Sequence, residues 1–122
     1  MKPGEFRIFF GAATAAASES AWRPAVDVYS TRAGGWVLKF ELPGVRPQDV
    51  AVAVQGCRVS VSGVRRDWLV EEGCEYQSME IAYDRFERAV ELPYELDSVT
   101  WTLEFRHGLL LVRLNPTKGA WP

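Results

Sequence analysis

Short alternating runs of apolar and polar residues, each stopped by a proline or a glycine, constrain the fold of this chain more than any other feature. Residues 50–54 (VAVAV) and 59–62 (VSVS) alternate strictly, which is the period-two pattern of strands with one buried face. The phrases at 41–50 (ELPGVRPQDV), 86–93 (FERAVELP) and 105–114 (FRHGLLLVRL) each join such a run to a turn. The sequence therefore predicts many short strands.

Further strands are predicted on the same grounds, and no long helix is. They lie at residues 26–30, 36–42, 76–81, 86–92, 99–105 and 109–114. The pattern lapses over residues 64–75 (VRRDWLVEEGCE), which predicts a long polar loop. This layout favours a β-sandwich, although periodicity alone leaves a closed barrel open.

The composition indicates one globular domain. The chain has 122 residues, of which 48% are hydrophobic and 25% charged, and its 14 basic and 16 acidic residues give a net charge of −2. The charges are interspersed, so we expect no nucleic-acid partner. No apolar run reaches the roughly 20 residues that span a bilayer, so we expect no membrane partner.

Residues 1–21 differ from the rest of the chain, with aromatic residues followed by an alanine-rich stretch. Glu5, Arg7 and Gly11 interrupt the apolar run, which argues against an export signal. We therefore expect a cytoplasmic protein with a short N-terminal arm, residues 1–21.

Neither catalysis nor a cofactor is indicated. His107 is the single histidine and precedes Gly108 in a predicted turn, where a left-handed backbone is a better explanation than general-base catalysis. Cys57 and Cys74 are predicted to be free thiols, because one pair in a protein that is not secreted is a weak disulfide signal. There is no metal-spaced cluster and no nucleotide-binding loop. We expect no enzyme, no metal and no cofactor.

The order and spacing of the strand phrases resemble the α-crystallin domain of small heat-shock proteins. Residues 22–29 (WRPAVDVY) and 58–63 (RVSVSG) take part in this resemblance, which covers residues 22–114. It implies an all-β fold, an immunoglobulin-like antiparallel β-sandwich, with a strand exchanged between subunits. It also implies that residues 115–122 are a short tail, here without the Ile-x-Ile/Val motif that many members carry.

The resemblance further implies a dimer interface. The strand at 76–81 is similar to the segment that bacterial and plant members exchange, and its partner strand corresponds to residues 26–30. Arg88 corresponds to an arginine that helps to hold the dimer, although pairing with Glu87 or Glu91 on an exposed strand explains it equally well. The expected interface residues are Val26, Val28, Tyr76, Ser78, Met79, Glu80 and Arg88.

Two client-binding surfaces are expected. One is the aromatic start of the arm, formed by Phe6, Ile8, Phe9 and Phe10. The other is a groove between two strands, implied by the resemblance and formed by Val50, Val52, Val54, Val99, Trp101 and Leu103. Because the arm is short and the tail motif is missing, we expect a homodimer or a small oligomer.

Three functions from different classes follow. The first is an ATP-independent holdase chaperone, which binds exposed apolar segments of unfolding proteins and suppresses their aggregation. The alternative is an adaptor or co-chaperone like the related CS domains, which binds one specific folded partner. A sandwich that binds a small ligand or a carbohydrate through exposed tryptophans is the third, and it has the weakest support in the sequence.

Overall fold

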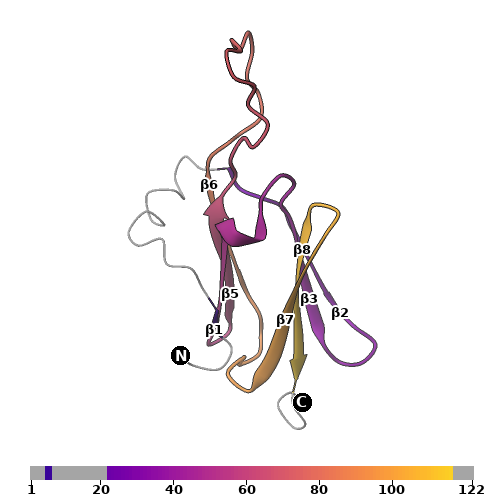
Figure 1. Cartoon of the computed structure of the whole chain (residues 1–122). Helices are drawn as coiled ribbons and strands as arrows, with labels where there is room; N and C mark the ends of the chain where they lie inside the picture. Colours follow the sequence, from indigo (N-terminus) through magenta and orange to yellow (C-terminus); the bar gives the residue numbers. More distant parts are fainter. Residues whose placement is uncertain (1–4, 7–21, 117–122) are drawn as a thin grey trace.

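The computed structural model describes residues 5–6 and 22–116. Within them the chain forms two four-stranded antiparallel sheets that face each other, as Figure 1 shows in a side view. One sheet has the strand order β1-β4-β5-β6 and the other β2-β3-β8-β7. The predicted β-sandwich is confirmed, because the strands form two separate sheets rather than one closed barrel.

The elements lie close to the predicted strands. They are β1 (Glu5–Phe6), β2 (Val26–Ser30), β3 (Trp36–Glu41), a 3-10 turn η1 (Pro47–Asp49), β4 (Val50–Gln55), β5 (Arg58–Val64), β6 (Arg85–Glu91), β7 (Val99–Arg106) and β8 (Leu109–Pro116). Two residues link β4 to β5, and two link β7 to β8. In the second link both His107 (φ 53°) and Gly108 (φ 76°) have positive φ, as a two-residue type I′ hairpin turn requires. The interpretation of His107 as a left-handed turn residue is thus confirmed.

Alternation along the strands builds the core between the sheets. Val50, Val52 and Val54 of β4 point inward beside Val59 and Val61 of β5. The second sheet supplies Leu38, Phe40, Leu110, Val112 and Leu114, all fully buried. Burial of these side chains is the main driving force for closing the sandwich.

Gly63 lets β5 lie close to its neighbours. A Cβ atom at this position would lie 2.1 Å from the backbone oxygen of Asp49 and 2.8 Å from the ring of Phe86. The absent side chain therefore gives the fully buried Phe86 its place on the inner face of β6.

Trp22 marks the point where the chain enters the sandwich. It forms an isolated parallel bridge with Phe86, and the two rings meet edge to face with centroids 5.4 Å apart. The segment that leads into β2 therefore runs beside β6, which places β2 and β6 at the same side of the sandwich. By the two strand orders, β4 and β7 lie at the opposite side.

Candidate functional site

The outer edge of β2 is open. In the part of the chain that the structure describes, β2 pairs with β3 alone and four of its five residues are exposed. Val28 shares the inner face with Leu38 but remains 38% exposed, and Tyr29 on the other face is 39% exposed. Unpaired N–H and C=O groups beside apolar side chains form a template for a further strand.

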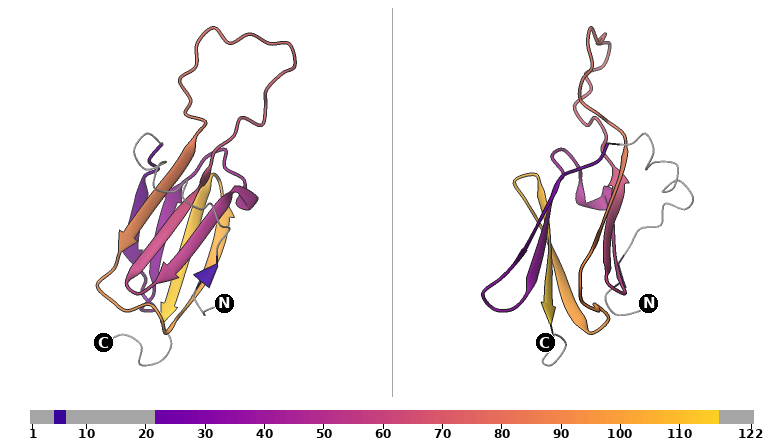
Figure 2. Two further views of the ribbon diagram at one scale, coloured as in Figure 1. Left: turned by 90° about the vertical axis from the view of Figure 1, so that its left-hand side faces the viewer. Right: turned by 180° about the vertical axis from the view of Figure 1, so that it is seen from behind.

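The second prominent feature is the loop of residues 65–84 between β5 and β6, which projects from one end of the sandwich (Figures 1 and 2). It carries most of the exposed large apolar side chains among the described residues: Trp68, Leu69, Val70, Tyr76, Met79, Ile81 and Tyr83. Leu69 is 92% exposed, and Met79 and Ile81 are each 61% exposed. Such a concentration on one loop is typical of an interaction surface.

The strand predicted at residues 76–81 is absent from this single chain. The segment is an irregular part of the loop and belongs to none of the strands, so the prediction of a strand there is corrected for the isolated subunit. The physical reason is that a strand is defined by its pairing, and none of the described strands pairs with this segment. The predicted loop at 64–75 is accordingly longer, and it extends to residue 84.

Arg88 lies on the inner face of β6, between Phe86 and Val90. Its Nη1 donates a hydrogen bond to the backbone oxygen of Pro24 at 2.7 Å. The Nε atom is buried and has no hydrogen-bond partner among the described residues. Glu91 instead pairs with Arg58, at 3.8 Å. Within one chain, Arg88 thus ties β6 to the segment that leads into the open β2 edge.

The residues expected to form a groove lie along β4 and β7, at the other side of the sandwich. Val50, Val52, Val54 and Val99 are buried, whereas Trp101 and Leu103 are partly buried and pack against the core. Phe105 continues the partly buried row on β7 and was missed by the sequence analysis. The apolar surface that remains accessible here is therefore supplied by β7.

The outer edge of β4 carries a short strand from the arm. Glu5 pairs with Ala53 and Phe6 with Val52, so β1 extends the sheet beyond β4, as the left view of Figure 2 shows. Phe6 is the one predicted arm residue whose backbone the structure describes. Ile8, Phe9 and Phe10 lie outside the described residues.

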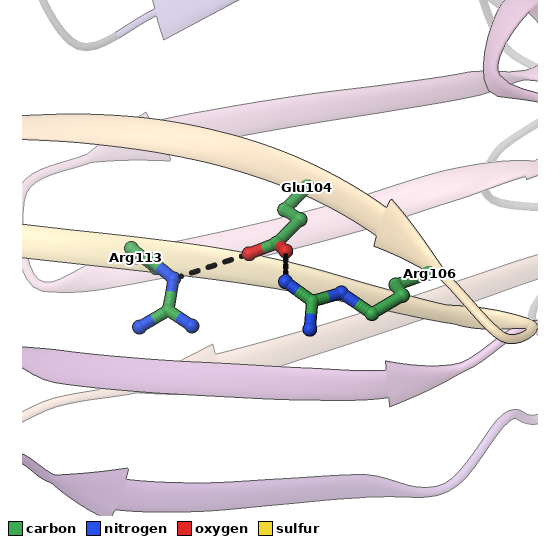
Figure 3. Close-up of polar contacts among 3 residues, drawn as sticks. All are labelled: Glu104, Arg106 and Arg113. Carbon is green, nitrogen blue, oxygen red and sulfur yellow. Dashed lines mark hydrogen bonds and ion pairs between the residues drawn. The ribbon is translucent and has the colours of Figure 1, made fainter.

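The outer face of the second sheet carries an ion-pair network of one carboxylate and two arginines. Glu104 of β7 accepts a hydrogen bond from Arg106 and another, at 3.4 Å, from Nε of Arg113 on β8 (Figure 3). The hydrogen bond from Arg106 holds the pKa of the Glu104 carboxyl below its ordinary value of 4.5. A carboxylate with a lowered pKa between two arginines is a solvated ion-pair network rather than a proton-transfer group.

Cys57 and Cys74 are both free thiols, as predicted. Among residues 5–6 and 22–116, no group of three or more His, Cys, Asp or Glu side chains is arranged to hold a metal ion. The same residues contain no helix of the length and hydropathy needed to cross a membrane.

In the described residues, the structure is thus an antiparallel β-sandwich with an unpaired edge on β2 and a projecting loop rich in exposed apolar side chains. The family model described as "Hsp20/alpha crystallin family" matches residues 29–121. The chain therefore belongs to the Hsp20/alpha-crystallin family of small heat-shock chaperones, and the resemblance seen in the sequence is confirmed.

Two curated relatives are about one-third identical to the chain. Spore protein SP21 of Stigmatella aurantiaca is 34% identical over 94 residues, which cover 77% of this chain and 55% of the relative. The 19.0 kDa class II heat shock protein of Oryza sativa is 35% identical over 97 residues, which cover 74% and 55%. The chain thus spans about half the length of these relatives.

Solved structures agree with the fold. HspA of Xanthomonas axonopodis is 28% identical, with a TM-score of 0.65 over 84% of this chain and 100% of that one. A small heat-shock protein of Xylella fastidiosa, described as having a distinct high order structure, is 27% identical, with a TM-score of 0.64 over 83% of this chain and 92% of that one.

The contacts that fasten the loop were not foreseen in the sequence. The guanidinium of Arg65 lies over the ring of Trp22 at 3.8 Å, and that of Arg46 lies over the ring of Trp68 at 3.4 Å. The available signal was the presence of arginines and a tryptophan at the start of the loop. Their partners lie elsewhere in the chain and could not be read from it.

Proposed function

We propose that this chain is an ATP-independent holdase, which binds exposed apolar segments of unfolding proteins and suppresses their aggregation. Membership of the small heat-shock family supports this function. The observation that carries it is the row of partly buried apolar side chains on β7, Trp101, Leu103 and Phe105, which lies at the side of the sandwich away from the β2 edge. A holdase needs accessible apolar surface among interspersed charges, and the chain has both.

The dimer proposed here uses the loop and the open edge together. Residues 76–81 of one copy add a strand to β2 of a second copy, and this pairing satisfies the backbone groups of both segments. As a strand, the segment would place Met79 and Ile81 on one face and Tyr76, Ser78 and Glu80 on the other. The apolar face would cover Val26 and Val28, and Arg88 would lie behind them at the same side of the sandwich.

Clients are proposed to bind at the opposite side, on the arm and the groove. The arm offers Phe6, Ile8, Phe9 and Phe10, and the groove offers the partly buried row on β7. Because β1 already pairs with β4, a client strand that uses the β4 edge would have to displace it. We also propose a cytoplasmic location, in keeping with the two free thiols.

The test is light scattering from a heat-denatured model client, without ATP and over a range of ratios. We expect suppression near equimolar subunits and recovery of the client in a soluble complex. A variant with Phe9 and Phe10 changed to serine should require more protein for the same effect, whereas serine at the exposed Leu69 serves as a matched control. Absence of suppression by a folded, dimeric protein would contradict the holdase and favour an adaptor for one folded partner.

A further inference from the structure

One side chain fastens the base of the loop. Arg65 follows β5 directly, and its backbone N–H donates to the backbone oxygen of Asp84 at 2.9 Å, which joins the two limbs at the base of the loop. Its Nε donates to the oxygen of Ala82 on the returning limb, also at 2.9 Å. Its Nη1 donates to the oxygen of Pro43 at 3.3 Å, which lies between β3 and β4.

The same guanidinium lies over the ring of Trp22, with its Cζ atom 3.8 Å from the ring centroid. Four separate parts of the chain therefore meet at Arg65: both limbs of the loop, the β3–β4 connection and the entry into the sandwich. A planar guanidinium can stack on a ring while its N–H groups point outward in the plane to several carbonyl oxygens. A lysine ammonium lacks this geometry, so the arrangement is specific to arginine.

An open cavity of about 630 Å³ lies beside this contact. Trp22, Pro43 and Arg65 line it on the side of the sandwich, and Ile81 and Tyr83 line it on the side of the returning limb. The returning limb thus stands away from the sandwich body, and the bond from Arg65 to Ala82 bridges the separation.

The outgoing limb has further attachments. Arg46 stacks on Trp68, and Nε of Arg66 lies 3.5 Å from Oδ1 of Asp49. Between the limbs, the hydroxyl of Tyr76 donates to the carboxylate of Asp67, which raises the pKa of Tyr76 to about 12. The outgoing limb is therefore fixed to the sandwich at several points and holds Tyr76 through Asp67, whereas the later part of the returning limb is joined to the sandwich by the bond from Arg65 to Ala82.

We propose that Arg65 is the positioning residue of the loop: its stack on Trp22 and its bonds to Pro43 and Ala82 hold the returning limb at the angle that presents residues 76–81 to the β2 edge of a second copy. The proposal rests on the dimer described above. It adds a residue that lies outside the expected interface and acts on it through the backbone of Ala82.

The test compares Arg65→Ala and Arg65→Lys with Arg58→Ala, a matched arginine control on β5, the strand that Arg65 follows, whose ion pair with Glu91 is exposed. Hydrogen–deuterium exchange of peptides from residues 76–84 is measured in dilute protein. Dimer dissociation is measured by sedimentation, and thermal unfolding reports on the sandwich.

We expect both Arg65 variants to exchange faster than the control at residues 80–84 and to raise the dimer Kd by about 10- to 100-fold. The melting temperature should stay near that of the control. Arg65→Lys keeps the positive charge but loses the planar guanidinium. If the lysine variant shows the same faster exchange and weaker dimer as the alanine variant, the planar contacts and not the charge alone position the loop. If the alanine variant does not fold, the exchange rate and dimer Kd of the lysine variant alone test the positioning role.

Exchange and Kd equal to those of the control would overturn the positioning role. If the unmodified chain does not dimerise, the proposed dimer is wrong, but exchange in the monomer still tests whether Arg65 fixes the limb. Aggregation suppression is scored separately, so failure of the holdase and failure of this contact are distinguishable.

Discussion

Phe86 and Ile81 are five residues apart, and they show how differently the sandwich and the loop use the same kind of side chain. Phe86 is 1% exposed and belongs to the core, whereas Ile81 is 61% exposed on the returning limb. The difference arises from pairing: β6 is hydrogen-bonded to β5 along its length, and the limb that precedes it pairs with none of the strands that the structure describes. Apolar content alone therefore does not separate core from interaction surface.

The largest effect should come from the core side of this comparison. Phe86→Ala removes a fully buried ring that packs against Trp22, and we expect it to lower the free energy of unfolding by about 3–5 kcal/mol. Ile81→Ala should change it by less than about 0.5 kcal/mol. Urea unfolding of both variants, below the dimer Kd, measures the contrast. Similar losses would mean that the loop is part of the folding core.

The next effect concerns association. Met79→Asp combined with Ile81→Asp places two charges on the face proposed to cover the partner's β2, and we expect the dimer Kd to rise by about 100-fold or more. Leu69→Asp adds a charge to the same loop outside that segment and should leave the Kd nearly unchanged. Sedimentation of the variants provides the readout. An unchanged Kd in the double variant would exclude the exchanged strand.

A smaller effect is expected from the arm. Deletion of residues 1–21 removes β1 but keeps Trp22, so the sandwich should melt at nearly the same temperature. Client affinity should fall by about tenfold, or about 1.4 kcal/mol. Titration of an unfolded fluorescent client measures it. A truncated chain that binds clients as well as the whole one would move the binding site to the groove.

The smallest effect is electrostatic. The pKa of Glu104 is lowered in the folded state, so its contribution to stability is present above the ordinary carboxyl pKa and is lost as the pH falls through the folded value. Glu104→Gln should therefore reduce the acid-side dependence of the melting temperature slightly, and added salt should weaken the difference. Identical pH profiles for the two proteins would show that the pair contributes nothing.

Features governed by local rules were predictable from the sequence. The alternation at 50–54 and 59–62 gave the right strands to within one or two residues, and the Arg-His-Gly hinge gave the hairpin turn. The family could be predicted from the order of these strand and turn motifs along the sequence. These features depend on residues that are close together in the sequence, so their spacing can be read directly from it.

Features that depend on distant partners were not predictable. The segment 76–81 has strand-like composition, but without a second edge it forms no strand. Arg65 contacts Trp22 and Pro43, which lie 43 and 22 residues earlier in the sequence. Hydrophobic periodicity predicts local structure only and gives no information on contacts between such distant positions. The pairing of β1 with β4 is equally non-local.

The two arginine–tryptophan stacks also have an optical consequence. Indole emission responds to a neighbouring cation, and Trp22 and Trp68 each lie beside a guanidinium group at a different attachment of the loop to the sandwich. Their emission should therefore shift when either attachment opens. With phenylalanine at the other tryptophan positions, each of the two becomes a native probe of one attachment, so movements of the loop can be timed in solution without an added dye.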